Sequence, residues 1–260
     1  MKTVVITGST KGIGLGLAEQ FIKRGHRVVV SGRNRERIEQ EVHRLASVYG
    51  KEHVSGTVCD VTDPEQVRLL WEFAVTAALG RNGTSEVTHE SPGPHDVPPK
   101  NGPSATVDIW INCAGLSHPV QNIIDLEPHV IRGVINTNVT GLLLCCSIAG
   151  KKMREQGHGF IYNFEGFGST GQNRPGVSVY GASKRTVNYI NKSLKKELRG
   201  TGVKVGALYP GMVVTDLLIG DMDNMEPGER EQFRKIINIL ADPVEPVTEF
   251  LADRMLKNQK

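Results

Sequence analysis

The sequence predicts a doubly wound α/β fold, in which helices cover both faces of a parallel sheet. Short β-branched, apolar runs alternate with longer stretches of helical periodicity, a pattern typical of parallel strands joined by crossover helices. Such a sheet is covered on both faces, so its strands are expected to be apolar along most of their length. With 260 residues, 38% of them hydrophobic, the chain can bury one sizeable core, and we expect a single domain over residues 1–260.

The first predicted elements form a β-α-β unit. Residues 3–7, TVVIT, predict a strand that runs into a glycine-rich turn and a helix over 14–24. Gly25 ends that helix, residues 26–31 predict the second strand, and a polar helix over about 35–49 follows.

The same alternation continues to residue 210. Further strands are expected at 54–61, 107–115, 160–164 and 203–210, and further helices at about 64–79, 130–155 and 180–199.

One segment interrupts the pattern, from about residue 80 to residue 106. It is rich in Pro, Gly and Ser and has almost no apolar residues, so it cannot bury a core. We expect a flexible insertion there, because surface loops tolerate insertions well. A loop that docks a partner is the alternative.

The charge and the cysteines exclude several classes of protein. The formal net charge is +3 and the Lys and Arg residues are scattered, which argues against a nucleic-acid-binding protein. The four cysteines have neither the paired spacing of a zinc site nor the density of a secreted disulfide scaffold, so we expect reduced thiols and no metal site. They are Cys59, Cys113, Cys145 and Cys146.

No apolar run approaches the roughly 18 residues that are needed to span a bilayer. The strand-like segment directly after Met1 is unlike a secretory signal. We therefore expect no transmembrane segment and a soluble protein, cytoplasmic by default or located in a plastid if a transit peptide has been removed.

The glycine-rich turn at residues 7–14, TGSTKGIG, predicts a Rossmann-type dinucleotide site. Gly8, Gly12 and Gly14 permit a tight turn and let backbone N–H groups approach a pyrophosphate at a helix N-terminus. The position between a strand and a helix supplies the context that this motif requires. We expect cofactor contacts from Gly8, Ser9, Thr10, Lys11, Gly12, Ile13 and Gly14.

The end of the second strand favours NADP(H) over NAD(H). An NAD-binding protein usually offers an acidic side chain to the ribose hydroxyls there, but this chain reads Ser31, Gly32, Arg33. No carboxylate repels a 2′-phosphate, and Arg33 and Lys11 are available as cations.

Tyr180 and Lys184 of the segment YGASK form the candidate catalytic pair. Residues four apart lie on one face of a helix. A neighbouring ammonium favours the ionised phenol and brings its pKa closer to the range where proton transfer is efficient. The same spacing also occurs as an ordinary surface pair.

From Thr3 to about Thr215 these motifs, in this order, resemble the short-chain dehydrogenase/reductase family. The resemblance implies Asp60 near the adenine, the structural NCAG motif at 112–115, Asn138 of NVTG as a catalytic residue beside Tyr180 and Lys184, and YPGMVVTD over the nicotinamide. It adds to the cofactor site Asp60, Asn112, Ala114, Gly115, Tyr180, Lys184, Pro210, Gly211 and Thr215. It also implies a homodimer or homotetramer.

One position departs from the family. The family has a serine about 13 residues before the tyrosine to hold the substrate carbonyl, and Phe167 stands there. Alignment on the strand FIYNF instead puts Glu165 and Gly166 at the usual pair of serines. Ser169 or Thr170 are candidate substitutes, although a turn role is at least as probable for both.

The departure and its surroundings resemble the chlorophyll b reductase branch of the family. GFIYNFEGFGSTG, NTNVTGLLLCC and INILADPVEPVTEFL are similar to that branch, and the similarity reaches the substrate-pocket region at about 211–257. The resemblance implies NADPH-dependent reduction of the C7 formyl group of chlorophyll(ide) b to 7-hydroxymethyl. It implies Tyr180 as proton donor, Lys184 as ribose ligand, Asn138 as anchor of a relay water, and Ser169 or Glu165 orienting the formyl oxygen.

The C-terminal region carries an apolar stripe that suits a flat macrocycle, although such stripes are usually core or subunit contact. It comprises Phe233, Ile236, Ile237 and Leu240. Four histidines are candidate ligands for a pigment's magnesium, but they fall in loops or polar stretches, which argues against that role: His89, His95, His118 and His129. Two other functions stay open, a generic carbonyl reductase and a non-catalytic NADP(H)-binding protein.

Overall fold

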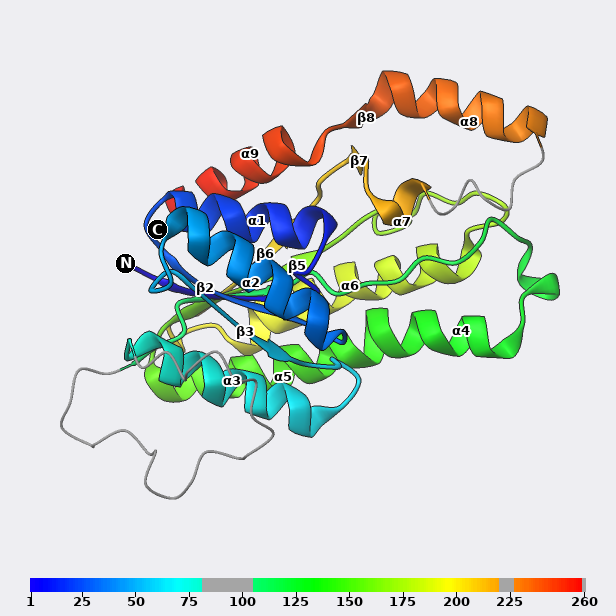
Figure 1. The fold of residues 1–260 in the computed structure, drawn as a ribbon. Helices are drawn as coiled ribbons and strands as arrows, with labels where there is room; N and C mark the ends of the chain where they lie inside the picture. The colour runs from blue at the N-terminus through cyan, green and yellow to red at the C-terminus, as the bar shows by residue number, and fades with distance from the viewer. Residues whose placement is uncertain (81–104, 220–226, 259–260) are drawn as a thin grey trace.

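A sheet of parallel strands lies at the centre of the molecule, with helices on both sides (Figure 1). The computed structural model describes residues 1–80, 105–219 and 227–258. The sheet strands are β1 (Thr3–Thr7), β2 (Arg27–Gly32), β3 (Val54–Val58), β4 (Ile109–Asn112), β5 (Gly159–Phe164) and β6 (Val203–Leu208). They hydrogen-bond in the order β3-β2-β1-β4-β5-β6, with every neighbouring pair parallel. The predicted doubly wound Rossmann fold is confirmed.

Helices pack on both faces of this sheet. One face carries α1 (Gly12–Lys23), α2 (Arg35–Tyr49) and α9 (Val244–Lys257), and the other carries α3 (Pro64–Ala78), α5 (Leu142–Gln156) and α6 (Ser178–Glu197). Successive strand residues point to opposite faces. Val4 and Ile6 therefore lie in the first core, between the sheet and α1, α2 and α9. Val5 lies in the second core, between the sheet and α3, α5 and α6.

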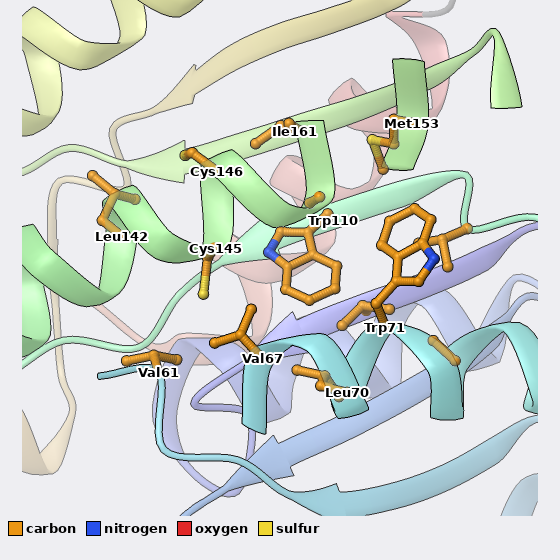
Figure 2. Packing of buried hydrophobic residues seen from close by; sticks show 14 of the residues in the cluster. Val61, Val67, Leu70, Trp71, Trp110, Leu142, Cys145, Cys146, Met153 and Ile161 are labelled. Carbon is orange, nitrogen blue, oxygen red and sulfur yellow. The ribbon is translucent and has the colours of Figure 1, made fainter. Parts of the chain in front are cut away.

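The second core is centred on two tryptophans, as Figure 2 shows. Trp110 of β4 is fully buried and stacks on Trp71 of α3, with ring centroids 6.0 Å apart and planes 23° from parallel. Cys145 and Cys146 of α5 belong to the same buried cluster. Burial raises the pKa of the Cys146 thiol to about 12, so it behaves as an apolar side chain at neutral pH.

Capping residues explain why α2 and α3 begin where the sequence predicts. The Asn34 side chain accepts a hydrogen bond from the Arg37 N–H at 2.8 Å. The Asp63 carboxylate accepts from the Glu65 N–H at 2.9 Å, and Pro64 takes the first helical position.

Three predicted strands are shorter than expected, and the one at 203–210 ends as β6 at Leu208. The expected strand at 107–115 ends as β4 at Asn112, since the Thr7 hydroxyl accepts from the N–H groups of Cys113 and Ala114 at 3.1 and 3.2 Å. The expected strand at 54–61 ends as β3 at Val58. The expected insertion at 80–106 lies almost wholly outside the described residues.

The expectation that nothing in the chain approaches a membrane span needs one correction. α4 (Pro128–Ile135), a π-helical turn (Asn136–Gly141) and α5 form a continuous helix of 29 residues that is long and apolar enough to span a bilayer. The most apolar stretch of 18 residues in this helix is 44% buried. Its second part, α5, packs against α3 and β5. A core helix of a soluble protein meets the same criteria. The helix expected at about 130–155 covers nearly all of it.

The C-terminal region adds elements that the sequence did not predict individually. β7 (Met212–Val213) and β8 (Ala241–Asp242) form a small parallel ribbon, flanked by α7 (Asp216–Ile219) and α8 (Pro227–Leu240). In Figure 1, α8 lies away from the sheet, whereas α9 runs beside α1. Of the predicted apolar stripe, Phe233 and Ile237 are buried and pack with Val120 and with Met212 of β7. The rest of the stripe is exposed, Leu240 by 62%.

Candidate active site

The candidate site lies at the carboxyl ends of β1 and β4, where the strand order reverses. Ligands of doubly wound sheets bind in the crevice at this point. Gly8, directly after β1, has φ +64°, and a Cβ on it would lie 2.7 Å from the Cα of Ala114. Only glycine permits this contact, which joins the two turns that frame the crevice.

The glycine-rich turn forms a cradle that fits a pyrophosphate. A Cβ on Gly14 would lie 2.5 Å from the Gly8 carbonyl oxygen, and Gly12 has φ +56° with Thr215 beside it. No side chain caps the N-terminus of α1, and its first turn has no acidic residue. The first N–H groups of this 12-residue helix are therefore left for an anion. Ile13 is the second residue of α1, whereas Pro210 is partly exposed and Gly211 has φ +77° in an exposed turn after β6.

The other residues of the turn differ in their surroundings. Ser9 is fully buried, and its hydroxyl donates to the Ile6 carbonyl at 2.6 Å and accepts from the Ser31 N–H at 2.9 Å. It therefore shapes the turn rather than facing solvent. Thr10 packs against Gly32, the last residue of β2. A Cβ added to that glycine would lie 3.1 Å from the threonine methyl.

The two candidate cations for a 2′-phosphate are both exposed. Arg33 follows β2 directly. The Lys11 ammonium pairs with Asp216 of α7 at 3.2 Å, and both side chains are more than half exposed. Such a pair contributes little to stability, so Lys11 can exchange this partner for a phosphate at small cost. Asp60, near the end of β3, accepts hydrogen bonds from the N–H and hydroxyl of Thr62 at 2.9 and 2.8 Å.

Asn112 belongs to a buried chain of amides that runs across the sheet. The Trp110 indole donates to Asn112 at 2.8 Å, Asn112 donates to Asn163 at 2.7 Å, and Asn163 donates to Asn191 at 2.7 Å. Asn191 in turn donates to the Glu165 carboxylate at 2.9 Å. The Asn112 side chain thus ties β4 to β5, whereas the sequence placed it in the cofactor site.

Tyr180 and Lys184 lie one turn apart on α6, as the sequence predicts. The Lys184 ammonium lies 5.6 Å from the centre of the Tyr180 ring and donates to the Phe164 carbonyl at 3.1 Å. Lys184 is buried, and burial lowers the pKa of its ammonium below the usual value, although nearby Cys113 and Glu165 oppose this shift. Tyr180 remains partly exposed. A cation is therefore held beneath a phenol that solvent can reach.

Asn138 ties three segments of the site together from the π-helical turn. Its amide exchanges two hydrogen bonds with the backbone of Leu116, both 2.8 Å. It also donates to the Ser183 hydroxyl at 3.0 Å, and that hydroxyl donates to the Tyr180 carbonyl at 2.6 Å. Ser183 is a contributor that sequence reasoning missed, although its spacing of three from Tyr180 puts it on the same helical face.

His118, one of the four candidate metal ligands, is a buried residue whose two ring nitrogens contact the backbone. Its Nδ1 lies 2.8 Å from the Pro119 carbonyl, and its Nε2 accepts from the Tyr180 N–H at 3.3 Å. A carbonyl only accepts and an N–H only donates, so these partners fix the proton on Nδ1. His129 is exposed on α4, and His89 and His95 lie outside the described residues. The described part of the chain holds no cluster of three metal-ligating side chains.

Gly166 is the residue that faces the Tyr180 hydroxyl. A Cβ on Gly166 would lie 3.0 Å from the tyrosine oxygen, which agrees with the alignment on β5 that puts Gly166 at a family serine. Phe167, the residue found by counting back from Tyr180, is 39% exposed. Ser169 is fully buried with no partner for its hydroxyl among the described residues, and Thr170 is exposed.

Glu165 is turned away from Tyr180. Its carboxylate accepts from the side-chain amides of Asn191 and Asn188 on α6 at 2.9 and 3.1 Å. These contacts hold both carboxylate oxygens. The turn after β5 therefore offers a glycine, and neither this carboxylate nor the buried Ser169 hydroxyl, to a group beside Tyr180.

A glycine cradle beside a buried lysine and an accessible tyrosine defines a nicotinamide-dependent oxidoreductase site. The sequence profile of the short chain dehydrogenase family matches residues 2–81 and 103–226, and the chain belongs to this family. Among solved structures, actinorhodin polyketide ketoreductase with NADPH is 26% identical with a TM-score of 0.73 over 96% of this chain and 88% of that one. A Burkholderia phymatum family member in complex with NAD is 19% identical, with a TM-score of 0.78 over 99% and 86%.

Two of the relatives to which the chain is similar are chlorophyll(ide) b reductases. The chain is 37% identical over 253 residues to the chloroplastic chlorophyll(ide) b reductase NOL of Oryza sativa subsp. japonica, covering 95% of this chain and 64% of that protein. It is 38% identical to the protein of the same name from Arabidopsis thaliana, covering 95% and 63%. The chain therefore spans less than two thirds of the length of these relatives.

Proposed function

We propose that this oxidoreductase uses NADPH to reduce the C7 formyl group of chlorophyll b or chlorophyllide b to a 7-hydroxymethyl group. The observation that carries the proposal is the similarity to chlorophyll(ide) b reductases along 95% of the chain, which includes the C-terminal region that borders the site. The same relatives, both named as chloroplastic, support a plastid location. A homodimer or homotetramer stays a prediction.

Tyr180, Lys184 and Asn138 have distinct roles in the proposed reduction. When bound in the glycine-rich turn, NADPH would supply the hydride that the formyl carbon accepts. Tyr180 gives its hydroxyl proton to the carbonyl oxygen, which prevents an alkoxide from building up. Lys184, buried 5.6 Å from the tyrosine ring, stabilises the phenolate that this proton transfer leaves. Asn138 holds the Tyr180 turn of α6 in place through Ser183. Its amide already bonds the Leu116 backbone and the Ser183 hydroxyl, so the proposed relay water would have to be held by a group other than these partners.

NADPH is proposed over NADH because of the charges around the cofactor turn. Arg33 and Lys11 are exposed at the end of β2 and in the glycine turn, and β2 ends on Ser31 and Gly32 instead of a carboxylate. A 2′-phosphate between these two cations would gain charge-assisted hydrogen bonds.

The test is incubation of the purified protein with NADPH and chlorophyllide b, with the product identified by its mass and absorption. A gain of two hydrogen atoms at the formyl group supports the proposal. If only simple aldehydes and ketones react, a generic carbonyl reductase replaces it. Binding of NADPH without turnover of any carbonyl would identify a non-catalytic cofactor-binding protein.

A further inference from the structure

We propose that His118 is a positioning residue for Tyr180, because its imidazole supplies the acceptor that holds the Tyr180 backbone at the start of α6. The inference rests on the proposed role of Tyr180 as proton donor, and it holds for any carbonyl compound that the site reduces. His118 acts through the backbone of Tyr180, so it is not itself a catalytic residue.

The first turn of α6 takes its acceptor from a distant segment. The first four N–H groups of a helix have no partner within it, and a side chain at the N-cap position often accepts from the second or third of them. Val177 is the N-cap residue of α6 and makes no such bond, and Tyr180 is the third residue of the helix. Instead, Nε2 of His118 accepts from the Tyr180 N–H at 3.3 Å, across 62 residues of the chain. This imidazole therefore replaces a helix cap at the residue that carries the phenol.

The imidazole is held in the form that can accept. Nδ1 of His118 lies 2.8 Å from the Pro119 carbonyl, which can only accept, so the ring proton is on Nδ1 and the lone pair of Nε2 faces the Tyr180 N–H. The side chain of His118 is only 3% exposed. Both ring nitrogens thus have backbone partners, and the ring orientation is fixed.

The segment that carries His118 also reaches the carbonyl of Tyr180. That carbonyl accepts from the Ser183 hydroxyl at 2.6 Å, and the same hydroxyl accepts from the Asn138 amide at 3.0 Å. Asn138 in turn bonds both backbone groups of Leu116, two residues before His118. The backbone of Tyr180 is therefore held on its N–H side by His118 and on its carbonyl side through Ser183 and Asn138.

Lys184 is held by a separate contact, its donation to the Phe164 carbonyl at 3.1 Å. Loss of the His118 acceptor should therefore shift the Tyr180 phenol while the lysine keeps its place. A shift on the order of 1 Å in a reacting group can lower a rate about 100-fold. The expected effect is on kcat, with little effect on the binding of NADPH.

The experiment compares His118→Met with His118→Gln, two side chains of similar length of which only glutamine carries a strong acceptor. We expect kcat for reduction of 4-nitrobenzaldehyde by NADPH to fall about tenfold or more in His118→Met and to stay within about threefold of wild type in His118→Gln. The KM for NADPH should stay within about threefold of wild type in both variants. His129→Met, at an exposed position of α4, is the matched control and should behave as wild type.

Exchange of the Tyr180 amide hydrogen, followed by NMR, tests the contact without turnover. It should be faster in His118→Met than in wild type and His118→Gln, because the N–H has lost its acceptor. Equal exchange in all three proteins, or equal losses of kcat in the two variants, would overturn the inference. The proposed function fails separately, when wild type does not reduce chlorophyllide b while amide exchange and 4-nitrobenzaldehyde kinetics still distinguish methionine from glutamine at this position.

Discussion

The Lys184 ammonium lies 5.6 Å from the centre of the Tyr180 ring and is buried against the Phe164 carbonyl, to which it donates at 3.1 Å. Burial disfavours the charged form and lowers the pKa of this lysine, with Cys113 and Glu165 acting in the opposite direction. The protein therefore tolerates a desolvated cation at the place where a phenolate would form. This arrangement makes the stability of the fold depend on pH.

Lys184→Met should change the pH dependence of stability. Between the lowered pKa of Lys184 in the folded protein and its usual value of 10.5, the unfolded chain holds a proton that the folded chain has released. Stability from this group therefore rises with pH across that window. Urea unfolding of both proteins at pH 7 and at about pH 9.5 should show wild type gaining stability relative to Lys184→Met. Parallel pH dependence would contradict this, and Lys192→Met, which removes an exposed charge on α6, is the control.

Asn138→Ala should lower both stability and activity. The substitution leaves the Leu116 N–H and carbonyl without their side-chain partner and removes the link to Ser183. Unsatisfied buried polar groups cost about 1–3 kcal/mol, which denaturant unfolding would detect. Asn136→Ala, an exposed position in the same π-helical turn, should stay within about 0.5 kcal/mol of wild type. Equal effects of the two substitutions would mean that the Asn138 contacts contribute nothing specific.

Gly8→Ala should abolish the cofactor site through a backbone collision. The added Cβ would lie 2.7 Å from the Ala114 Cα, in a residue that already needs φ +64°. Gly25→Ala is the matched control, since it has φ +75° with nothing within 4 Å of the added atom. We expect NADPH affinity, measured by fluorescence titration, to fall more than about tenfold for Gly8→Ala only. Similar affinities would place the cofactor away from the Gly8 turn.

Arg33→Ala should weaken NADPH binding about tenfold and leave NADH binding nearly unchanged, because only the former offers a 2′-phosphate. Isothermal titration with both cofactors measures this difference. Arg37→Ala, an exposed arginine within α2, serves as the control. Loss of affinity for both cofactors alike would show that Arg33 does not read the phosphate.

The parts of the fold that sequence reasoning predicted are those with local signals. The glycine turn, the starts of the helices at about residues 35 and 64, and the Tyr180 and Lys184 spacing each depend on residues close in the chain. The missed features depend on contacts between distant segments. His118 meets the Tyr180 N–H across 62 residues, and Asn138 meets the Leu116 backbone across 22 residues.

The amide chain shows the same limit in another way. The motif assigns Asn112 to the cofactor site, which stays a prediction, and the structure shows its side chain between Trp110 and Asn163. Register between β4 and β5 places Asn112 opposite Asn163, and no local pattern reveals that pairing. The sequence motif alone therefore does not tell whether the side chain of such a residue faces a ligand or packs between strands.

The most direct test of the account is the rate of NADPH oxidation with chlorophyllide b by wild type and Tyr180→Phe. The account predicts turnover by wild type, a fall of about 100-fold or more in the variant, and equal NADPH affinity for both, since only the proton donor is removed. Turnover that survives in Tyr180→Phe would contradict the role of Tyr180, and failure of wild type to reduce the pigment would contradict the proposed substrate.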